Sequence, residues 1–75
     1  MNMATVTIDA LGLKCPQPIL KIAAKSPDMK PGDVLEITAD CATFEKDLRA
    51  WCDRMKKVLL WVRNEGGKYR AQIQF

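Results

Sequence analysis

The 75-residue chain contains no histidine, the side chain that most often serves as a general base and that activates the nucleophile of a Cys-His dyad. Its three cysteines form neither a disulfide framework nor the paired spacing of a zinc site. No stretch approaches the ~20 apolar residues of a membrane span, and residues 1–8 lack the basic and apolar regions of a secretory signal. We therefore expect a cytoplasmic protein with reduced thiols and with neither a metal nor another cofactor.

Length and charge narrow the function classes further. A chain of this size is one domain, residues 1–75, and it is too small to enclose an active site, so any chemistry lies at its surface. The net charge of +3 is uneven, because residues 38–75 carry eight basic and five acidic side chains whereas residues 1–37 carry four of each. This excess is too weak to indicate nucleic acid binding. We expect a monomer that does not bind membranes.

Hydrophobic periodicity predicts two helices and four strands. Residues 5–8 alternate as a half-buried strand does, residues 34–39 form a second strand after a turn over 28–33, and residues 58–62 form a third. Residues 64–67 are a hairpin turn before an alternating last strand with Tyr69, Ala71, Ile73 and Phe75 on one face. One helix runs from Pro16 to about Lys25, with Ile19, Leu20 and Ala23 on its apolar face. The apolar face of the other helix consists of Phe44, Leu48, Trp51, Cys52 and Met55.

The order of these elements, βαβαββ, predicts an α+β fold, a two-layer α/β sandwich. Its four-stranded mixed sheet carries both helices on one face. A right-handed crossover makes the first two strands parallel, so the segments that follow them emerge at one sheet edge. Cys15 and Cys41 both lie in those segments, at the edge where open α/β sheets bind ligands.

The segment Cys15-Pro16-Gln17-Pro18 is the strongest functional signal in the chain. Pro16 pushes the preceding residue into extended geometry, which predicts Cys15 as the N-cap and Pro16 as the first helical residue. Pro18 occupies the place of the second cysteine in a Cys-x-x-Cys redox motif. Cys15 therefore has no local resolving partner, which favours a thiol that carries a group over a dithiol oxidoreductase.

The surroundings of Cys15 predict a reactive thiolate. The amides of Gln17 and Ile19 are expected to be the free donors nearest its sulfur, at the positive end of the helix dipole. Lys14 adds a neighbouring cation. We expect the pKa of Cys15 to lie below that of a free cysteine.

The segment Ile8–Pro18, IDALGLKCPQP, resembles the start of the TusA/SirA family of small sulfur carriers, whose pattern is Leu-Asp-x-x-Gly-x-x-Cys-Pro-x-Pro. The segment 30–33 and Asp40 are also similar to the family. The resemblance implies that Cys15 is the reactive residue, supported by the neighbouring residues Gly12, Lys14, Pro16, Gln17 and Pro18. Gln17 stands where many members have Glu, and Asp40-Cys41-Ala42-Thr43 stands where many have Asp-Asp-Pro-Ala.

The resemblance also implies a function. Cys15 would accept sulfane sulfur as a persulfide from a cysteine desulfurase or a rhodanese-type donor and relay it to an acceptor protein. Tasks across the family include tRNA thiolation, sulfur oxidation and cofactor maturation. Such a chain is a sulfurtransferase-type carrier rather than an independent enzyme.

Several alternatives remain open from the sequence. Cys41 is either a second sulfur-handling or resolving thiol or a buried turn residue, whereas Cys52 lies on an apolar helix face and is expected in the core. Trp61 can face either side of the sheet. Two other functions remain as rivals. The first is a nucleic-acid-binding or regulatory module, which the scarcity of aromatic residues weakens. The second is a peroxide-sensing single-cysteine protein, which the lack of a neighbouring resolving thiol weakens.

Overall fold

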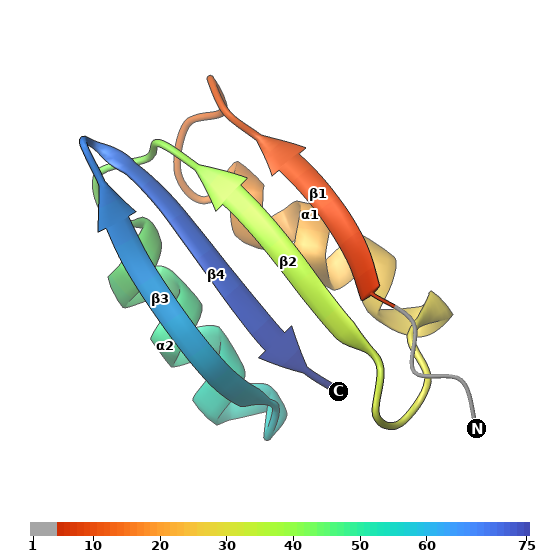
Figure 1. Ribbon diagram of the computed structural model, residues 1–75. Coiled ribbons are helices and arrows are strands. Elements are labelled where there is room, and N and C mark those ends of the chain that lie inside the picture. The colour runs from red at the N-terminus through yellow and green to blue at the C-terminus, as the bar shows by residue number, and fades with distance from the viewer. Residues whose placement is uncertain (1–4) are drawn as a thin grey trace.

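The computed structural model describes residues 5–75. Residues 1–4, which belong to the expected domain and to the segment expected to lack a secretory signal, lie outside the described residues. Its sheet has the order β1-β2-β4-β3, formed by β1 (Thr5–Ala10), β2 (Val34–Ala39), β4 (Lys68–Gln74) and β3 (Val58–Glu65). β1 and β2 are parallel, whereas β4 pairs antiparallel with both β2 and β3 (Figure 1). The predicted mixed four-stranded sheet is confirmed.

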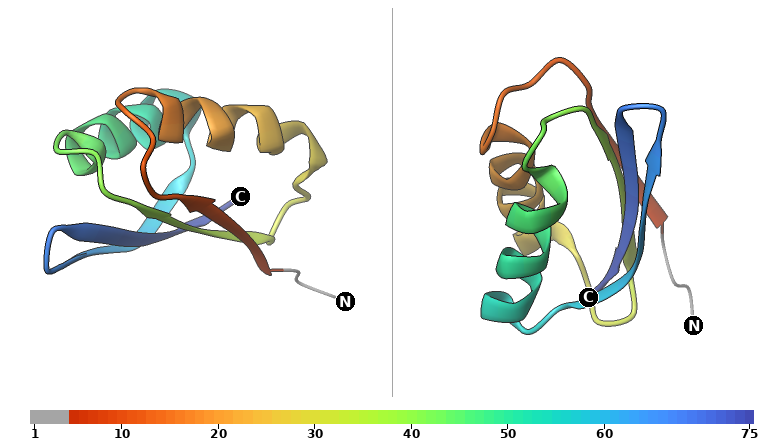
Figure 2. Two further views of the ribbon diagram at one scale, coloured as in Figure 1. Left: turned by 90° about the horizontal axis from the view of Figure 1, so that it is seen from above. Right: turned by 90° about the vertical axis from the view of Figure 1, so that its left-hand side faces the viewer.

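Both helices cover the same face of this sheet (Figure 2). α1 (Gln17–Lys25) continues into the short 3-10 helix η1 (Ser26–Asp28), and α2 (Phe44–Met55) follows β2. Between the two layers lie the largest fully buried side chains, which are Phe44, Ile22, Leu35, Ile37, Leu48, Ile73 and Pro18. The α+β sandwich with helices on one face is thus confirmed, and the opposite face of the sheet is open.

The predicted apolar face of α1 is partly wrong. Ile19 and Ile22 are buried, but Leu20 is 59% exposed and Ala23 is also exposed. The sheet contacts only one narrow stripe of a nine-residue helix, so a neighbouring apolar position is left in solvent. Met55, at the end of α2, is likewise 46% exposed, whereas the rest of the predicted stripe of α2 is buried.

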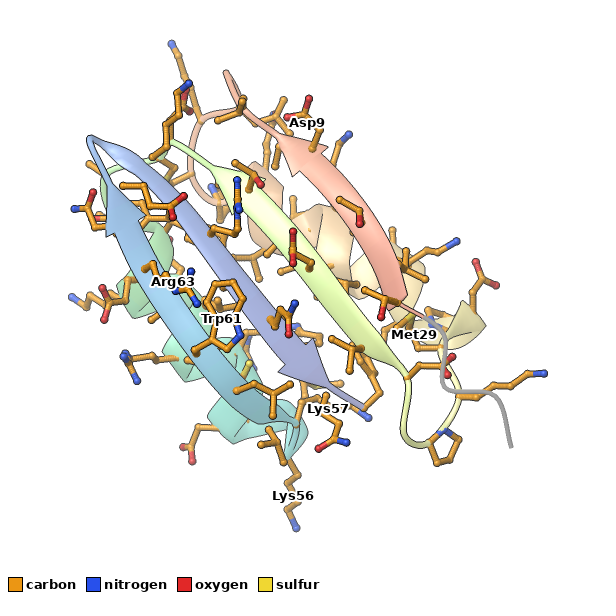
Figure 3. The ribbon with its side chains drawn as sticks, viewed as in Figure 1. Asp9, Met29, Lys56, Lys57, Trp61 and Arg63 are labelled. Atoms are coloured by element: carbon orange, nitrogen blue, oxygen red, sulfur yellow. A yellow bond between two sulfur atoms is a disulfide. The ribbon has the colours of Figure 1, made fainter. Side chains whose placement is uncertain are left out.

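A register shift in β3 settles the position of Trp61. β3 is longer than predicted, and the shift between Leu59 and Trp61 places Trp61 opposite Gln72, on the open face of the sheet. The guanidinium of Arg63 lies 4.3 Å from the centre of its ring (Figure 3). One face of the indole is therefore already covered. No helix within residues 5–75 has the length and apolar character needed to cross a membrane.

Candidate functional site

Two loops meet beyond the carboxyl ends of the parallel strands β1 and β2. The loop over residues 11–16 leads from β1 to α1, and the loop over residues 40–43 leads from β2 to α2. Because the strands are parallel and paired in register up to Ala10 and Ala39, both loops start at the same edge (Figure 1). The expectation that Cys15 and Cys41 share an edge is confirmed.

Cys15 and Cys41 are joined through their sulfur atoms as a disulfide, and their Cα atoms lie 5.7 Å apart. Cys15 is on the surface, whereas Cys41 is only 6% exposed. The motif itself offers Cys15 no thiol partner, and Cys41, which the sequence left open as a resolving thiol or a buried turn residue, is both buried and paired with Cys15. Local spacing excludes a partner within the motif, but the crossover brings one from the neighbouring loop.

Hydrogen bonds to two aspartates shape the loop that carries Cys15. The Asp9 carboxylate accepts a bond from the Leu11 amide at 3.0 Å, which closes the turn after β1. Gly12 follows with a φ of +80°, a backbone conformation that side chains other than glycine disfavour. The Gly12 amide donates to Asp40 at 3.0 Å, so the two loops are held against each other.

The start of α1 differs from the prediction. Pro16 is the N-cap and the helix begins at Gln17, so Cys15 lies one residue before the cap, joined to Pro16 by a cis peptide bond. The Gln17 amide donates to the Lys14 carbonyl at 2.8 Å, and the Ile19 amide donates to the Pro16 carbonyl at 3.0 Å. Neither amide is therefore available to the sulfur as expected, because the tight entry turn uses both of them.

A threonine hydroxyl contacts the sulfur instead. Thr43 Oγ1 donates to Cys15 Sγ at 2.9 Å, and it lies 2.9 Å from Asp47 Oδ2 and 3.7 Å from Cys41 Sγ. The hydroxyl has a single hydrogen, so it can donate to either the sulfur or the carboxylate at one time. Thr43 thus links both cysteines to a carboxylate in the first turn of α2.

Sequence reasoning missed Thr43 and Asp47 as site residues. The available signal was that Thr43 directly precedes the helical period, the usual place of a capping hydroxyl, and lies one helical turn before Asp47. Here the hydroxyl makes no capping bond. It is turned to the cysteines and to Asp47 instead.

The ligand atoms of Cys15, Cys41 and Asp47 all lie within 4.8 Å of one another. Two thiolates and one carboxylate are ligand types that suit Zn²⁺. The sequence predicted no metal because the ligand spacing is not local. The fold supplies three such ligands only when the cysteines are reduced, since sulfurs bonded to each other are not thiolates.

Cys52 lies apart from this site and is 3% exposed in the core, as predicted. Burial raises the pKa of its thiol from 9.0 to about 11. Cys52 therefore stays protonated at neutral pH and is not a nucleophile there.

Apolar surface flanks the site. Leu11 is 39% and Leu20 is 59% exposed. An open hollow of about 320 Å³ adjoins the motif and is lined by Leu13, Gln17, Leu20, Lys21 and Ala24. Exposed apolar surface of this kind is typical of a face that contacts another protein.

Two comparisons with known proteins concern the fold and the family of this chain. The chain is similar to the crystal structure of a SirA-like protein from Desulfitobacterium hafniense, with a TM-score of 0.74 and 23% identity over 96% of each chain, which supports the shared fold. Residues 6–75 match the family described as Sulfurtransferase TusA. Since that match includes both loops and all of the core, the chain belongs to the TusA family, whose general role is sulfur transfer.

Proposed function

We propose that this protein is a monomeric sulfur carrier that accepts sulfane sulfur as a persulfide on Cys15 and relays it to an acceptor protein. The observation that carries the proposal is the place of Cys15 Sγ, at the surface and in contact with the hydroxyl of Thr43. A transferable sulfur has to be reached by two different proteins in turn. A side chain in an exposed loop permits this, and a buried one does not.

Loading needs Cys15 in its reduced form, as in a cytoplasmic environment. The Cys15 thiolate attacks the outer sulfur of a donor persulfide, the donor thiolate leaves, and the sulfur is retained as Cys15-S-SH. Delivery is the same displacement with an acceptor thiolate as the attacking group. The Thr43 hydroxyl, 2.9 Å from Sγ, can donate a hydrogen bond to the anionic sulfur before the attack and after delivery.

A cysteine desulfurase or a rhodanese-type protein is the proposed donor. The exposed side chains of Leu11 and Leu20, and the hollow that Leu20 and Gln17 help to line, support docking of a protein near the Cys15 loop. The proposed acceptor is a protein of tRNA thiolation, sulfur oxidation or cofactor maturation. The open face of the sheet gives less support to a nucleic acid partner, because Arg63 already covers one face of Trp61.

The test uses a variant in which Cys15 is the only cysteine, carrying Cys41→Ser and Cys52→Ser. It is incubated with a cysteine desulfurase and cysteine, and its intact mass is measured before and after reduction. We expect the mass of one added sulfur atom, removed by reductant. The matched control is Cys15→Ser with both other cysteines present. Equal sulfur uptake by this control, or no uptake by the Cys15-only protein, would refute the proposal.

A further inference from the structure

Cys41 has no role in the carrier function described above, yet its sulfur is within bonding reach of Cys15. We propose that Cys41 is a second nucleophile, which displaces the outer sulfur of a Cys15 persulfide as hydrosulfide and leaves a Cys15-Cys41 disulfide. The inference rests on the proposed persulfide at Cys15. It gives that persulfide a second fate, the release of inorganic sulfide when no acceptor is docked.

The backbone geometry suits this bond. The Cα atoms are 5.7 Å apart, within the usual range of ~4.4 to 6.8 Å for disulfides. Cys41 is held by the turn in which its carbonyl accepts the Phe44 amide at 3.1 Å, and Asp40 joins this loop to Gly12. The inner sulfur of the persulfide is the Cys15 Sγ itself, so the attack has the same reach as the disulfide that the structure contains.

Thr43 offers a path for the proton. Its hydroxyl oxygen lies 3.7 Å from Cys41 Sγ and 2.9 Å from both Cys15 Sγ and Asp47 Oδ2. The Cys41 thiol can pass its proton to the oxygen of this hydroxyl while the hydroxyl's own hydrogen passes to the outer sulfur on Cys15, which then leaves as HS⁻. Removing the proton turns Cys41 into the thiolate that attacks.

Atoms and electrons balance in the step. The Cys15 persulfide anion and the Cys41 thiol become the Cys15-Cys41 disulfide and HS⁻: the S-S bond to the outer sulfur breaks, and a new S-S bond forms between the cysteines. The outer sulfur gains two electrons, and the two cysteine sulfurs together lose two. A dithiol reductant then restores both thiols by thiol-disulfide exchange, and the cycle can repeat.

The burial of the two sulfurs divides their roles. Cys41 is 6% exposed, so a large donor or acceptor protein cannot reach it, whereas Cys15 is at the surface. Cys41 can therefore react with sulfur on Cys15 but cannot receive sulfur directly from a protein. Cys41 and Thr43 are also among the positions at which this chain departs from the family pattern of the second loop.

The test compares reduced wild type with Cys41→Ser, and Cys52→Ser is the matched control. Each protein is loaded with a low-molecular-weight persulfide and desalted without oxygen. Alkylated samples are then followed by intact mass, and monobromobimane traps released sulfide. We expect wild type and Cys52→Ser to lose the added sulfur, release one sulfide each and end as the disulfide. Cys41→Ser should keep its persulfide at least ~10-fold longer, because the intramolecular nucleophile is missing.

Each outcome decides between the two proposals. Equal persulfide lifetimes in wild type and Cys41→Ser would overturn the role of Cys41 while leaving the carrier function intact. A folding defect in Cys41→Ser is tested with a second variant, Cys41→Ala, and with circular dichroism. If both variants have native spectra and neither takes up sulfur, the carrier function and the role of Cys41 are both overturned. Sulfide release by wild type without disulfide formation would also refute the inference.

Discussion

The Gly12 amide donates to both carboxylate oxygens of Asp40, at 3.0 and 3.2 Å, across 28 positions of sequence. This bifurcated bond joins the loop that carries Cys15 to the loop that carries Cys41. A carboxylate acceptor makes it stronger than a bond between neutral groups. The relative position of the two sulfurs therefore depends on Asp40, although its carboxylate bonds to the Gly12 amide rather than to either sulfur.

We expect Asp40→Ala to lower the free energy of unfolding by about 1 kcal/mol, because the Gly12 amide loses a charged acceptor at an exposed site. The variant should also form the Cys15-Cys41 disulfide less readily in a glutathione redox titration. Urea denaturation measures the first effect. Asp53→Ala, at an exposed carboxylate on α2, is the control, and an equal change in both variants would contradict the role of Asp40.

Thr43→Val should slow alkylation of reduced Cys15 by iodoacetamide at neutral pH. The substitution keeps the shape of the side chain but removes the hydroxyl that lies 2.9 Å from Sγ. Loss of one hydrogen bond of ~1 kcal/mol corresponds to a rate reduction of about fivefold. Thr43→Ser keeps the hydroxyl and should restore most of the rate. If Thr43→Ser reacts as slowly as Thr43→Val, the alkylation rate of Cys15 depends on the packing of the Thr43 side chain rather than on its hydroxyl.

Cys52 should resist alkylation in the folded protein up to about pH 10, because burial raises its pKa to about 11. A Cys15→Ser, Cys41→Ser protein isolates this thiol, and urea should make it reactive at pH 8. As the pH rises, the Cys52 thiol ionises in the unfolded chain before it ionises in the folded protein. The contribution of the protonated thiol to the free energy of unfolding is therefore complete below pH 9.0 and is lost as the pH rises through about 11. Cys52→Ala should lack this fall in unfolding free energy, and an identical pH profile would contradict the assignment.

The two tryptophans should respond differently to substitution. Trp51 is 4% exposed in the core, so Trp51→Ala should cost about 3 to 5 kcal/mol of stability. Trp61 lies on the open face under Arg63, and Trp61→Ala should cost only about 1 kcal/mol. Sulfur uptake by the Trp61→Ala protein should equal that of the parent. Reduced uptake would show that the open face takes part in donor docking.

Periodicity was sufficient to predict the layers of this fold. The alternating pattern of β4 and the apolar stripe of α2 depend on neighbours within one element, and both are confirmed by the burial of Ala71, Ile73, Leu48 and Trp51. The face of α1 was harder to predict, because Ile19, Leu20 and Ile22 are similar in hydrophobicity. Which of them is buried depends on how the helix lies on the sheet, and only the packing of the whole domain determines that.

The position of Cys15 was predictable from the sequence, but its surroundings were not. The Cys-Pro-x-Pro segment places this thiol just before α1, and the parallel crossover places Cys41 at the same sheet edge. Whether two sulfurs at one edge touch depends on loop conformations set by Gly12, Asp9 and Asp40. The contact of Thr43 with Cys15 spans 28 residues, and no local pattern indicates it.

The Cys15-Cys41 bond encloses the segment that contains α1 and β2, with a sequence separation of 26 residues. In the chain-entropy account a cross-link of this span stabilises a fold by about 3.5 kcal/mol, because it restricts the unfolded chain. In the proposed carrier, reduction makes Cys15 available for sulfur and also removes this restriction. The form that would load sulfur is then the less stable form of the protein, and we expect proteases to degrade it faster than the disulfide form.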